Sequence, residues 1–374
     1  MNIPYGRQTI DEKDIQAVMD VLRSDYLTTG PNVAEFERKV AEYVGAKYAV
    51  AVCNGTAALH IACLAAGIEK GDEVITSPMT FAASSNCVLY CGGTPVFADI
   101  QPDTYNIDVV DMERKITEKT KAIIPVHYTG QPCDMDAITS IAKKHNLVVI
   151  EDAAHALGAS YKGCMIGSIS DMTCFSFHPV KPITTGEGGM VVTNDEKLYK
   201  RLVLFRSHGI TREEELMTEN QGGWYYQQLE LGYNYRITDI SCALGSSQLD
   251  KLDDFIAARK EIARRYDEAF QGIKALQIPV QKAGCESGWH LYMIQVLEKS
   301  RKEVFEGLRE SGIGVNVHYI PVYQHPYYQK NGYADCHCEN AELFYSRAIS
   351  LPIFPTLTEE QQQYVIDKVL ECVK

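Results

Sequence analysis

Short apolar runs alternate with helix-like segments between about residues 34 and 200. The runs are rich in valine, isoleucine and alanine, and most end at a polar residue, glycine or proline. The expected strands are residues 47–54, 72–78, 94–100, 121–128 and 147–154, with helices at 56–67, 81–93 and 134–146 between them. This alternation predicts an α/β domain with a mostly parallel sheet covered on both faces. Ligands of such sheets bind at the carboxyl ends of the strands.

The pattern changes past about residue 250. Residues 237–273 carry apolar side chains at helical spacing and predict one long helix. Shorter strands are expected at 289–296 and 312–319, and Thr358 with Gln361 predicts a capping box at the start of the last helix. We therefore expect two tightly packed domains, a large α/β domain over residues 1–249 and a smaller C-terminal α+β domain over residues 250–374.

Composition and charge restrict the class of protein. The chain has 374 residues, of which 45% are hydrophobic and 23% charged, as in ordinary soluble proteins. Its formal charge of −13 argues against binding to nucleic acids or anionic membranes, which would repel it. The start of the chain shows no signal-peptide pattern, and no apolar run is long enough to span a bilayer. We expect a cytoplasmic protein.

The cysteines favour buried apolar positions over metal ligation. Most of the 12 lie within apolar runs, where a reduced thiol acts as a small hydrophobic group. The exception is Cys336-His337-Cys338, whose cysteines are badly spaced for a zinc knuckle. We expect that stretch to be a surface loop, and we expect no metal.

Two of the expected strands end in residues suited to binding a phosphorylated ring. Asn54-Gly55-Thr56 joins a strand to a helix, where backbone N–H groups and the helix dipole favour a phosphate. A simple threonine-capped helix explains the same residues equally well. Asp152 ends a buried strand, where an unpaired carboxylate is costly. It either caps the next turn or pairs with a protonated ring nitrogen.

Lys181 suggests that these strand ends belong to one binding site. It lies between prolines just beyond another apolar strand, close to Ser176, where a lysine is usually a solvated loop residue. A lysine amine that a pocket deprotonates can instead form imines. Pyridoxal phosphate enzymes need such a lysine, an acidic partner for the ring nitrogen and a phosphate site. Lys181, Asp152 and the glycine turn together favour that class, and Phe81 could stack on the ring or belong to the core.

Longer stretches carry a resemblance to a known family. "NGTAAL", "TSPMTFAAS", "EDAAHALGA", "FSFHPVKPITTGEGGMVVTND", "FRSHGI" and "LGYNYRITDISCALGSSQLDKLD" occur in this order. The chain resembles the DegT family of sugar aminotransferases over essentially its whole length. The resemblance implies a large domain of the aspartate aminotransferase type (fold type I), a smaller C-terminal domain and pyridoxal 5'-phosphate as cofactor, with pyridoxamine phosphate as its intermediate form.

The resemblance also implies roles for individual residues. Lys181 would bind the cofactor as a Schiff base and shuttle protons, and Asp152 would keep the ring nitrogen protonated. Asn234 would reach the phosphate from the neighbouring subunit, which implies a homodimer with shared active sites. Without the resemblance, Asn234 would be read as a turn residue. The further cofactor-binding residues implied are Thr56, Ala57 and Ser176 at the phosphate, Phe81 on the ring face and His155 at the phenolic oxygen.

Within the family, "WYYQQLELGYNYR", "SGWHLYMI" and "GVNVHYIPVY" are most similar to members of the pseudaminic acid pathway. That similarity implies amination at C4 of UDP-2-acetamido-2,6-dideoxy-β-L-arabino-hexos-4-ulose, with L-glutamate as the donor. The arginines would meet the donor carboxylate or the diphosphate. The substrate-binding residues implied are Leu27, Arg7, Arg236, Tyr319 and Tyr323.

Four other functions are alternatives. Sugar 3-dehydratases of the family carry histidine in place of the lysine, so Lys181 favours transamination. A different nucleotide 4-keto sugar, UDP-D-xylo, GDP-linked or dTDP-linked, stays open. A non-catalytic regulator with the same fold would have no need of Lys181. A nicotinamide-binding domain is disfavoured because no G-x-G-x-x-G follows the first strand.

Overall fold

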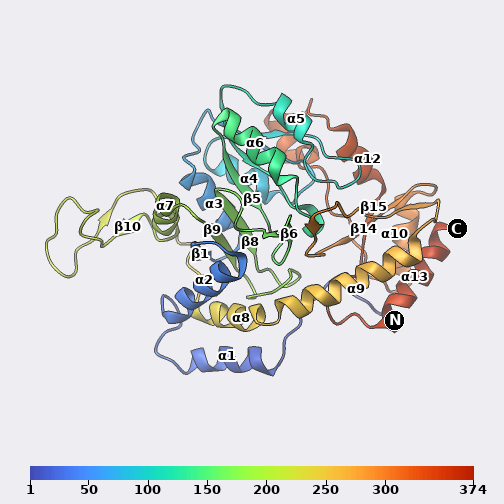
Figure 1. Ribbon diagram of the computed structural model, residues 1–374, viewed down its shortest axis with the longest axis horizontal. Helices are drawn as coiled ribbons and strands as arrows, with labels where there is room; N and C mark the ends of the chain where they lie inside the picture. The colour runs from blue at the N-terminus through green and yellow to red at the C-terminus, as the bar shows by residue number, and fades with distance from the viewer.

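A seven-stranded sheet lies at the centre of the large domain, in the computed structural model that describes residues 1–374 (Figure 1). The strand order is β1-β9-β8-β5-β4-β2-β3, and only β9 runs against the others, so the predicted mostly parallel sheet is confirmed. The strands are β1 (Tyr48–Val52), β2 (Glu73–Thr76), β3 (Thr94–Phe97), β4 (Thr120–Ile124), β5 (Val148–Asp152), β8 (Met172–Ser176) and β9 (Gly189–Thr193).

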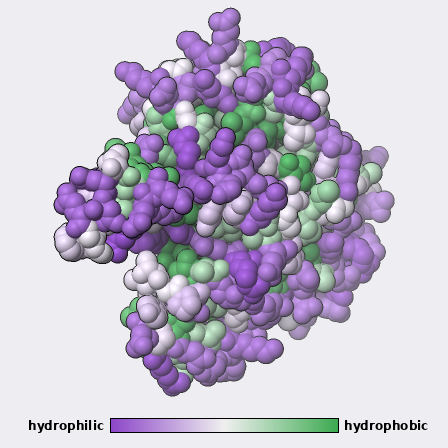
Figure 2. Space-filling view, turned by 60° about the vertical axis from the view of Figure 1, so that its left-hand side comes forward, coloured by the Kyte–Doolittle hydropathy of each residue, from purple (hydrophilic) through white to green (hydrophobic).

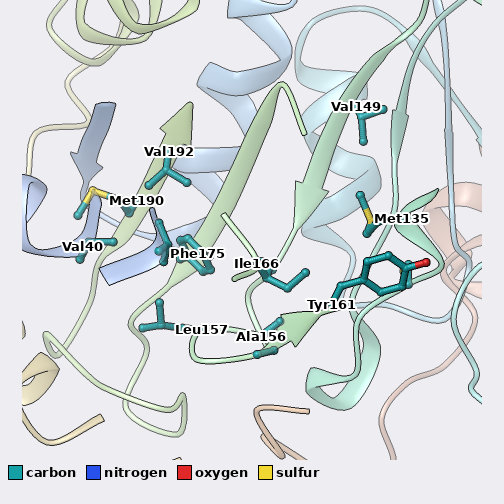
Figure 3. Close-up of a cluster of buried hydrophobic side chains, with 14 of the residues drawn as sticks. Val40, Met135, Val149, Ala156, Leu157, Tyr161, Ile166, Phe175, Met190 and Val192 are labelled. Carbon is teal, nitrogen blue, oxygen red and sulfur yellow. The ribbon is translucent and has the colours of Figure 1, made fainter. Parts of the chain in front are cut away.

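Helices cover both faces of this sheet. One face packs against α2 and α6, and the other packs against α3, α4 and α7. Neighbouring strand residues point to opposite faces, as the pleat requires: Met190 and Val192 belong to the first cluster and Val191 to the second. Figure 3 shows residues of the cluster on the first face, among them Val40 of α2 and Met190 and Val192 of β9. The helices are α2 (Pro31–Val44), α3 (Gly55–Ala65), α4 (Ala83–Tyr90), α5 (Val109–Arg114), α6 (Met135–His145) and α7 (Glu196–Arg206).

The prediction of one long helix over residues 237–273 is wrong, because the chain forms two helices there. They are α8 (Asp239–Leu249) and α9 (Leu252–Phe270). The amide of Lys251 bonds back to Gln248 in a tighter turn, and its ammonium group contacts Asp14 at 2.6 Å and Asp11 at 3.0 Å beside α1 (Glu12–Leu22). This break lets α8 pack under the large domain while α9 continues into the C-terminal part (Figure 1).

The C-terminal part has its own core. A cluster of buried apolar residues joins Ile3 to side chains between residues 262 and 373. Its antiparallel sheet has the order β12-β14-β15, and Thr358 and Gln361 form the predicted capping box of α13. The domain boundary at residue 249 stays a prediction. The elements are β12 (Leu276–Gln277), β14 (Tyr292–Val296), α10 (Arg301–Glu310), α12 (Glu339–Arg347), β15 (Ala348–Leu351) and α13 (Glu359–Val373).

The strand predicted at residues 312–319 is also wrong. Only single bridges occur there, from Ile313 to Ile3 and from Asn316 to Ser350. The segment leaves the small sheet because residues 316–319 bend toward the large domain and line a cavity there. Its apolar alternation reflects burial against both domains and not a ladder of strand hydrogen bonds.

A segment between α7 and α8 projects from the body of the protein. It contains the short strands β10 (Ile210–Thr211) and β11 (Gln227–Gln228) and stands out at the left of Figure 1. Figure 2 shows its surface to be mostly hydrophilic. Trp224 and Leu231 are nevertheless 72% and 76% exposed, more than is usual for large apolar side chains.

A buried pair of polar residues supports the sheet behind the strand ends. Glu151 and His127 are fully buried, and His127 Nε2 donates to Glu151 at 2.6 Å because its Nδ1 accepts from the amide of Cys133. Ser170 and Thr173 donate to the other carboxylate oxygen. Burial by itself would raise the pKa of Glu151, but these donors hold it below its ordinary value.

Replacing His127 by alanine is therefore expected to lower the free energy of unfolding by about 3 kcal/mol, because Glu151 would lose a donor in a dry site. Urea denaturation at pH 7 measures the change. Lys144→Ala is the matched control, since it breaks the exposed pair with Glu113 and should leave stability unchanged. Equal stability of H127A and K144A would contradict the argument.

No helix has both the length and the apolar character needed to cross a membrane.

Candidate active site

A cavity of about 600 Å³ opens at the carboxyl ends of β5 and β8. The end of β5, the loop after β8 and the N-terminus of α3 form one wall, and residues 316–319 of the C-terminal part form another. Its position follows the expectation for an α/β sheet. The predicted site residues that line it are Thr56, Phe81, Asp152, His155, Ser176, Lys181 and Tyr319.

Lys181 extends into this cavity from a fixed loop. Its amide donates to the carbonyl of His178 at 2.9 Å, and Thr184 and Thr185 bond to the carbonyl of Phe177. Burial lowers the pKa of Lys181 to about 8, although the charge of Asp152 acts in the opposite direction. About a tenth of the amine is therefore neutral at pH 7, far more than for an ordinary lysine, and a nucleophilic lysine reacts through this neutral form.

Asp152 caps the turn after its strand and also borders the cavity. The amide of Ala154 donates to its Oδ1 at 3.1 Å, so it caps the turn after β5. The hydroxyl of Ser84 donates to its Oδ2 at 2.5 Å, and Ser84 also contacts Thr80. The carboxylate is 5% exposed and still borders the cavity. It is thus a fixed acceptor that can pair with one further cationic group.

The N-terminus of α3 also lines the cavity. Asn54 caps the helix by accepting from the amide of Ala57 at 2.8 Å, and Thr56 lines the cavity one residue earlier. A Cβ atom at Gly55 would lie 2.9 Å from the Cβ of Ser176, so only glycine lets the serine approach this turn. Backbone N–H groups and two hydroxyls thus surround a space that suits a phosphate.

Three buried histidines surround the amine of Lys181. His155 Nε2 lies 3.1 Å from the hydroxyl of Tyr319, while its Nδ1 is buried without a protein partner. Burial and the charge of Lys181 lower the pKa of His318 to about 4 and that of His155 well below its ordinary value. His290 lies opposite, with Nε2 3.4 Å from Lys181 Nζ. All three rings are neutral near neutral pH.

These features fit pyridoxal phosphate. Asp152 can hold the proton of a pyridine nitrogen, Lys181 can reach the aldehyde carbon, and the orphaned Nδ1 of His155 leaves a polar position for the phenolic oxygen. Phe81 is 63% exposed at the cavity, which suits a ring that stacks on a cofactor. The anionic phosphate would then meet the N-terminus of α3.

Several predicted residues lie outside the cavity. Leu27 and Asn234 are exposed on the surface, and Arg236 is half-buried. Tyr323 is buried, and its hydroxyl donates to Glu342 at 2.7 Å and accepts from the amide of Cys338 at 3.0 Å. His337 also contacts Glu342.

Arg7 and Ala57 also lie apart from the cavity. Arg7 borders a separate small space behind Lys181 that Arg259 also lines. Ala57 is buried, and its amide is used in the cap of α3.

Sequence reasoning missed four residues of the site, namely Thr80, Ser84, His290 and His318. Thr80 and Ser84 lie close in sequence to Phe81, which was predicted to contact the cofactor, so this nearness could have identified them. His290 and His318 fall in stretches expected to be strands of the small domain. Only the tertiary structure brings them to Lys181.

Enzymes of fold type I carry pyridoxal phosphate on a lysine at the strand ends of such a sheet, and the protein is an aminotransferase of this class. Residues 8–370 match the sequence profile of the DegT/DnrJ/EryC1/StrS aminotransferase family, and the chain belongs to that family.

Curated relatives match the whole chain. The spore coat polysaccharide biosynthesis protein SpsC of Bacillus subtilis is 46% identical over 100% of this chain and 97% of its own length. The UDP-4-amino-4,6-dideoxy-N-acetyl-beta-L-altrosamine transaminase of Campylobacter jejuni (serotype O:23/36, strain 81-176) is 40% identical over 100% of this chain and 98% of its own length.

Solved structures of related proteins have the same fold. Helicobacter pylori PseC, an aminotransferase of pseudaminic acid biosynthesis, matches with a TM-score of 0.93 and 36% identity over 100% of this chain and 99% of that one. The sugar aminotransferase Spr1654 of Streptococcus pneumoniae in its PMP form matches with a TM-score of 0.94 and 35% identity over 100% and 99%. A PLP form of the same protein also matches, so the family's cofactor is pyridoxal phosphate.

Ser84 provides a test of the site. Ser84→Ala removes the donor to Asp152, so we expect affinity for pyridoxal phosphate to fall about tenfold, because hydrogen bonds to charged groups are worth about 1.5–3 kcal/mol. Absorbance titration of the cofactor-free protein measures it. Ser85→Ala is the matched control, because Ser85 is equally buried on the same helix and contacts Tyr328 and the carbonyl of Ala82 instead. Equal affinities of S84A and S85A would contradict this role.

Proposed function

We propose that the protein transfers the amino group of L-glutamate to C4 of UDP-2-acetamido-2,6-dideoxy-β-L-arabino-hexos-4-ulose. The observation that carries the chemistry is the buried, partly neutral amine of Lys181 in a cavity that also holds Asp152. The choice of sugar is supported by full-length similarity to the Campylobacter jejuni transaminase and to Helicobacter pylori PseC. The reaction would serve pseudaminic acid biosynthesis, in the cytoplasm.

The two catalytic residues have distinct tasks in this proposal. When bound, pyridoxal phosphate supplies a conjugated ring that withdraws electrons from the carbon that gains or loses a proton. Lys181 attaches the cofactor and carries protons to and from the reacting carbons, for which a pKa near neutrality is suited. Asp152, fixed by Ser84 and by the amide of Ala154, keeps the ring nitrogen protonated.

Other residues of the cavity would hold the cofactor in place. Thr56 and Ser176 offer hydroxyls to the phosphate at the N-terminus of α3, with the backbone at Ala57 completing the turn. Phe81 would stack on the ring, and His155 would bond its phenolic oxygen. The hydroxyl of Tyr319 lies 3.1 Å from Nε2 of His155, which leaves Nδ1 as the ring nitrogen available to that oxygen.

A second copy of the chain would complete the active site. Asn234 is exposed, and it follows the projecting segment whose apolar residues Trp224 and Leu231 have no cover within one chain. We infer that this segment packs on a partner subunit and that Asn234 reaches the phosphate of the partner's cofactor. Leu27 and Arg236, also outside the cavity of one chain, would line the sugar pocket from the same side.

Tyr319, Tyr323 and Arg7 differ in how each could contact the substrate. Tyr319 lines the cavity and can meet the sugar directly. Tyr323 would act through packing, since its hydroxyl is engaged with Glu342. Arg7 would need to turn from its contact with the ring of Phe354 to reach a carboxylate or diphosphate.

A second candidate is another nucleotide 4-keto sugar. SpsC, a spore coat polysaccharide biosynthesis protein, is 46% identical to the chain, whereas the altrosamine transaminase is 40% identical. GDP-perosamine synthase of Escherichia coli O157:H7 is also 38% identical over 99% of this chain. The residues around Lys181 suit all these reactions, so the sugar is decided by the substrate pocket.

Direct assays with separate acceptors test the proposal. L-Glutamate is offered with the UDP-β-L-arabino 4-keto sugar, its D-xylo epimer or GDP-4-keto-6-deoxymannose, and products are identified by mass spectrometry. We expect amination of the L-arabino sugar alone, and none by Lys181→Ala. Amination of another sugar instead would retain the mechanism and replace the substrate. Activity of K181A would reject the mechanism itself.

Mixed dimers test the shared site. Lys181→Ala and Asn234→Ala should each lower activity strongly when pure. Random pairing of the two variants would restore about a quarter of the wild-type sites, because one site of each mixed dimer has both residues intact. Activity of the mixture after subunit exchange measures this recovery. A mixture no more active than its pure components would show that Lys181 and Asn234 do not meet across the subunit interface.

A further inference from the structure

His290 stands directly beside the reactive amine and has no role in the chemistry described so far. It lies just before β14, is 4% exposed and lines the cavity. Its Nε2 is 3.4 Å from Nζ of Lys181, which is a long hydrogen bond in the protein alone. Its ring also packs on His155, with 4.5 Å between the centroids. The ring therefore borders both the amine and a residue proposed to bind the cofactor.

The main chain of His290 is held firmly. One nitrogen of Arg259 donates to the carbonyls of Trp289 at 3.2 Å, His290 at 3.4 Å and Ile353 at 3.0 Å. On the other side, a Cβ atom at Gly130 would lie 2.9 Å from the amide nitrogen of Trp289. Because both domains fix this turn, the ring of His290 has little freedom to leave Lys181.

His290 is a neutral acceptor. Burial, and then the charges of Lys181 and neighbouring groups that include Arg259, lower the pKa of His290 well below its ordinary value. A neutral imidazole keeps one unprotonated ring nitrogen. If Nε2 accepts from Lys181, then Nδ1 carries the hydrogen, and this Nδ1 is buried without a protein partner.

No other side chain around Lys181 has an atom within hydrogen-bond distance of its Nζ. His155 Nε2 pairs with Tyr319, and His318 bonds Ser350 at 2.6 Å and Asn316 at 3.3 Å. Asp152 affects the amine through its charge alone. Arg7 and Arg259, on the far side, are cations that cannot accept a hydrogen bond. His290 is the remaining side chain with a nitrogen directed at Nζ.

We propose that His290 is a positioning residue, whose Nε2 accepts a hydrogen bond from the amine of Lys181 whenever that amine is not bonded to the cofactor. In transamination the lysine is released, must carry protons and must return to the same carbon. A flexible ammonium group without an acceptor would turn toward Asp152 or toward the substrate. His290 keeps the free amine directed along the cavity wall. This inference rests on the aminotransferase chemistry and is independent of which sugar is the substrate.

The test measures the titration of Lys181 itself, in enzyme loaded with pyridoxamine phosphate so that the lysine amine is free. Trace labelling with acetic anhydride across pH, read by peptide mass spectrometry, gives the midpoint at which Lys181 becomes reactive. We expect a wild-type midpoint near pH 8. His290→Phe removes the acceptor that favours the ammonium form, so its midpoint should fall by about one pH unit. His290→Gln retains an acceptor and should stay close to wild type.

Kinetics and controls complete the test. H290F should lower kcat about tenfold with KM for the sugar nearly unchanged, because the interaction concerns the lysine and not the substrate. His60→Gln alters a buried histidine outside the cavity and should not move the midpoint. Should H290F fail to fold, His290→Leu replaces it. An unchanged midpoint in the acceptor-free variant, or an equal shift in H290Q, would overturn the proposal.

Discussion

The reactivity of the site depends on the removal of one lysine amine from water. Desolvation disfavours the ammonium form of Lys181, and the charge of Asp152 partly restores it, so that the pKa settles at about 8. A fully solvated lysine would be almost entirely protonated at neutral pH, and a lysine paired closely with a carboxylate would be held as a cation. The loop from Phe177 to Gly188, the histidines and the C-terminal segment all serve to hold the amine between these limits.

The pleat of β5 separates a fully buried carboxylate from one that borders the cavity. Glu151 and Asp152 are neighbours, yet Glu151 is fully buried on His127, Ser170 and Thr173, whereas Asp152 borders the cavity. Successive strand residues must point to opposite faces, so one strand end can anchor the sheet and present a ligand. Backbone geometry acts in a similar way at Gly55, where the absence of a side chain lets Ser176 approach the turn. The site is thus built from backbone geometry that the sheet already provides.

Local sequence patterns predicted the large domain well because its elements are short, strongly apolar and close to their partners along the chain. The strand ends with Thr56, Asp152 and Lys181 could be identified for the same reason. The wall contributed by the C-terminal part could not, because His290 and His318 reach the cavity only through domain packing. Apolar alternation at 312–319 predicted a strand, although those residues are buried by contact with both domains. The break at Lys251 depends on Asp11 and Asp14, far away in sequence.

The residues outside the cavity show a different limit. Asn234, Leu27 and Arg236 were assigned through family resemblance, and one chain places them at its surface. Their proposed roles depend on a second subunit, whose position can be seen neither in the local sequence pattern nor in the fold of one chain. Tyr323 differs, since its hydroxyl is already satisfied within the chain by Glu342 and Cys338.

The central claim is that Lys181, and no other lysine, carries the cofactor. Borohydride reduction of the protein loaded with pyridoxal phosphate would fix the cofactor permanently to its lysine, and peptide mass spectrometry would locate it. We expect the modification on the peptide that contains Lys181, at one per chain. A modification on a different lysine, or spread over surface lysines with Lys181 unmodified, would contradict the assignment of this cavity as the active site.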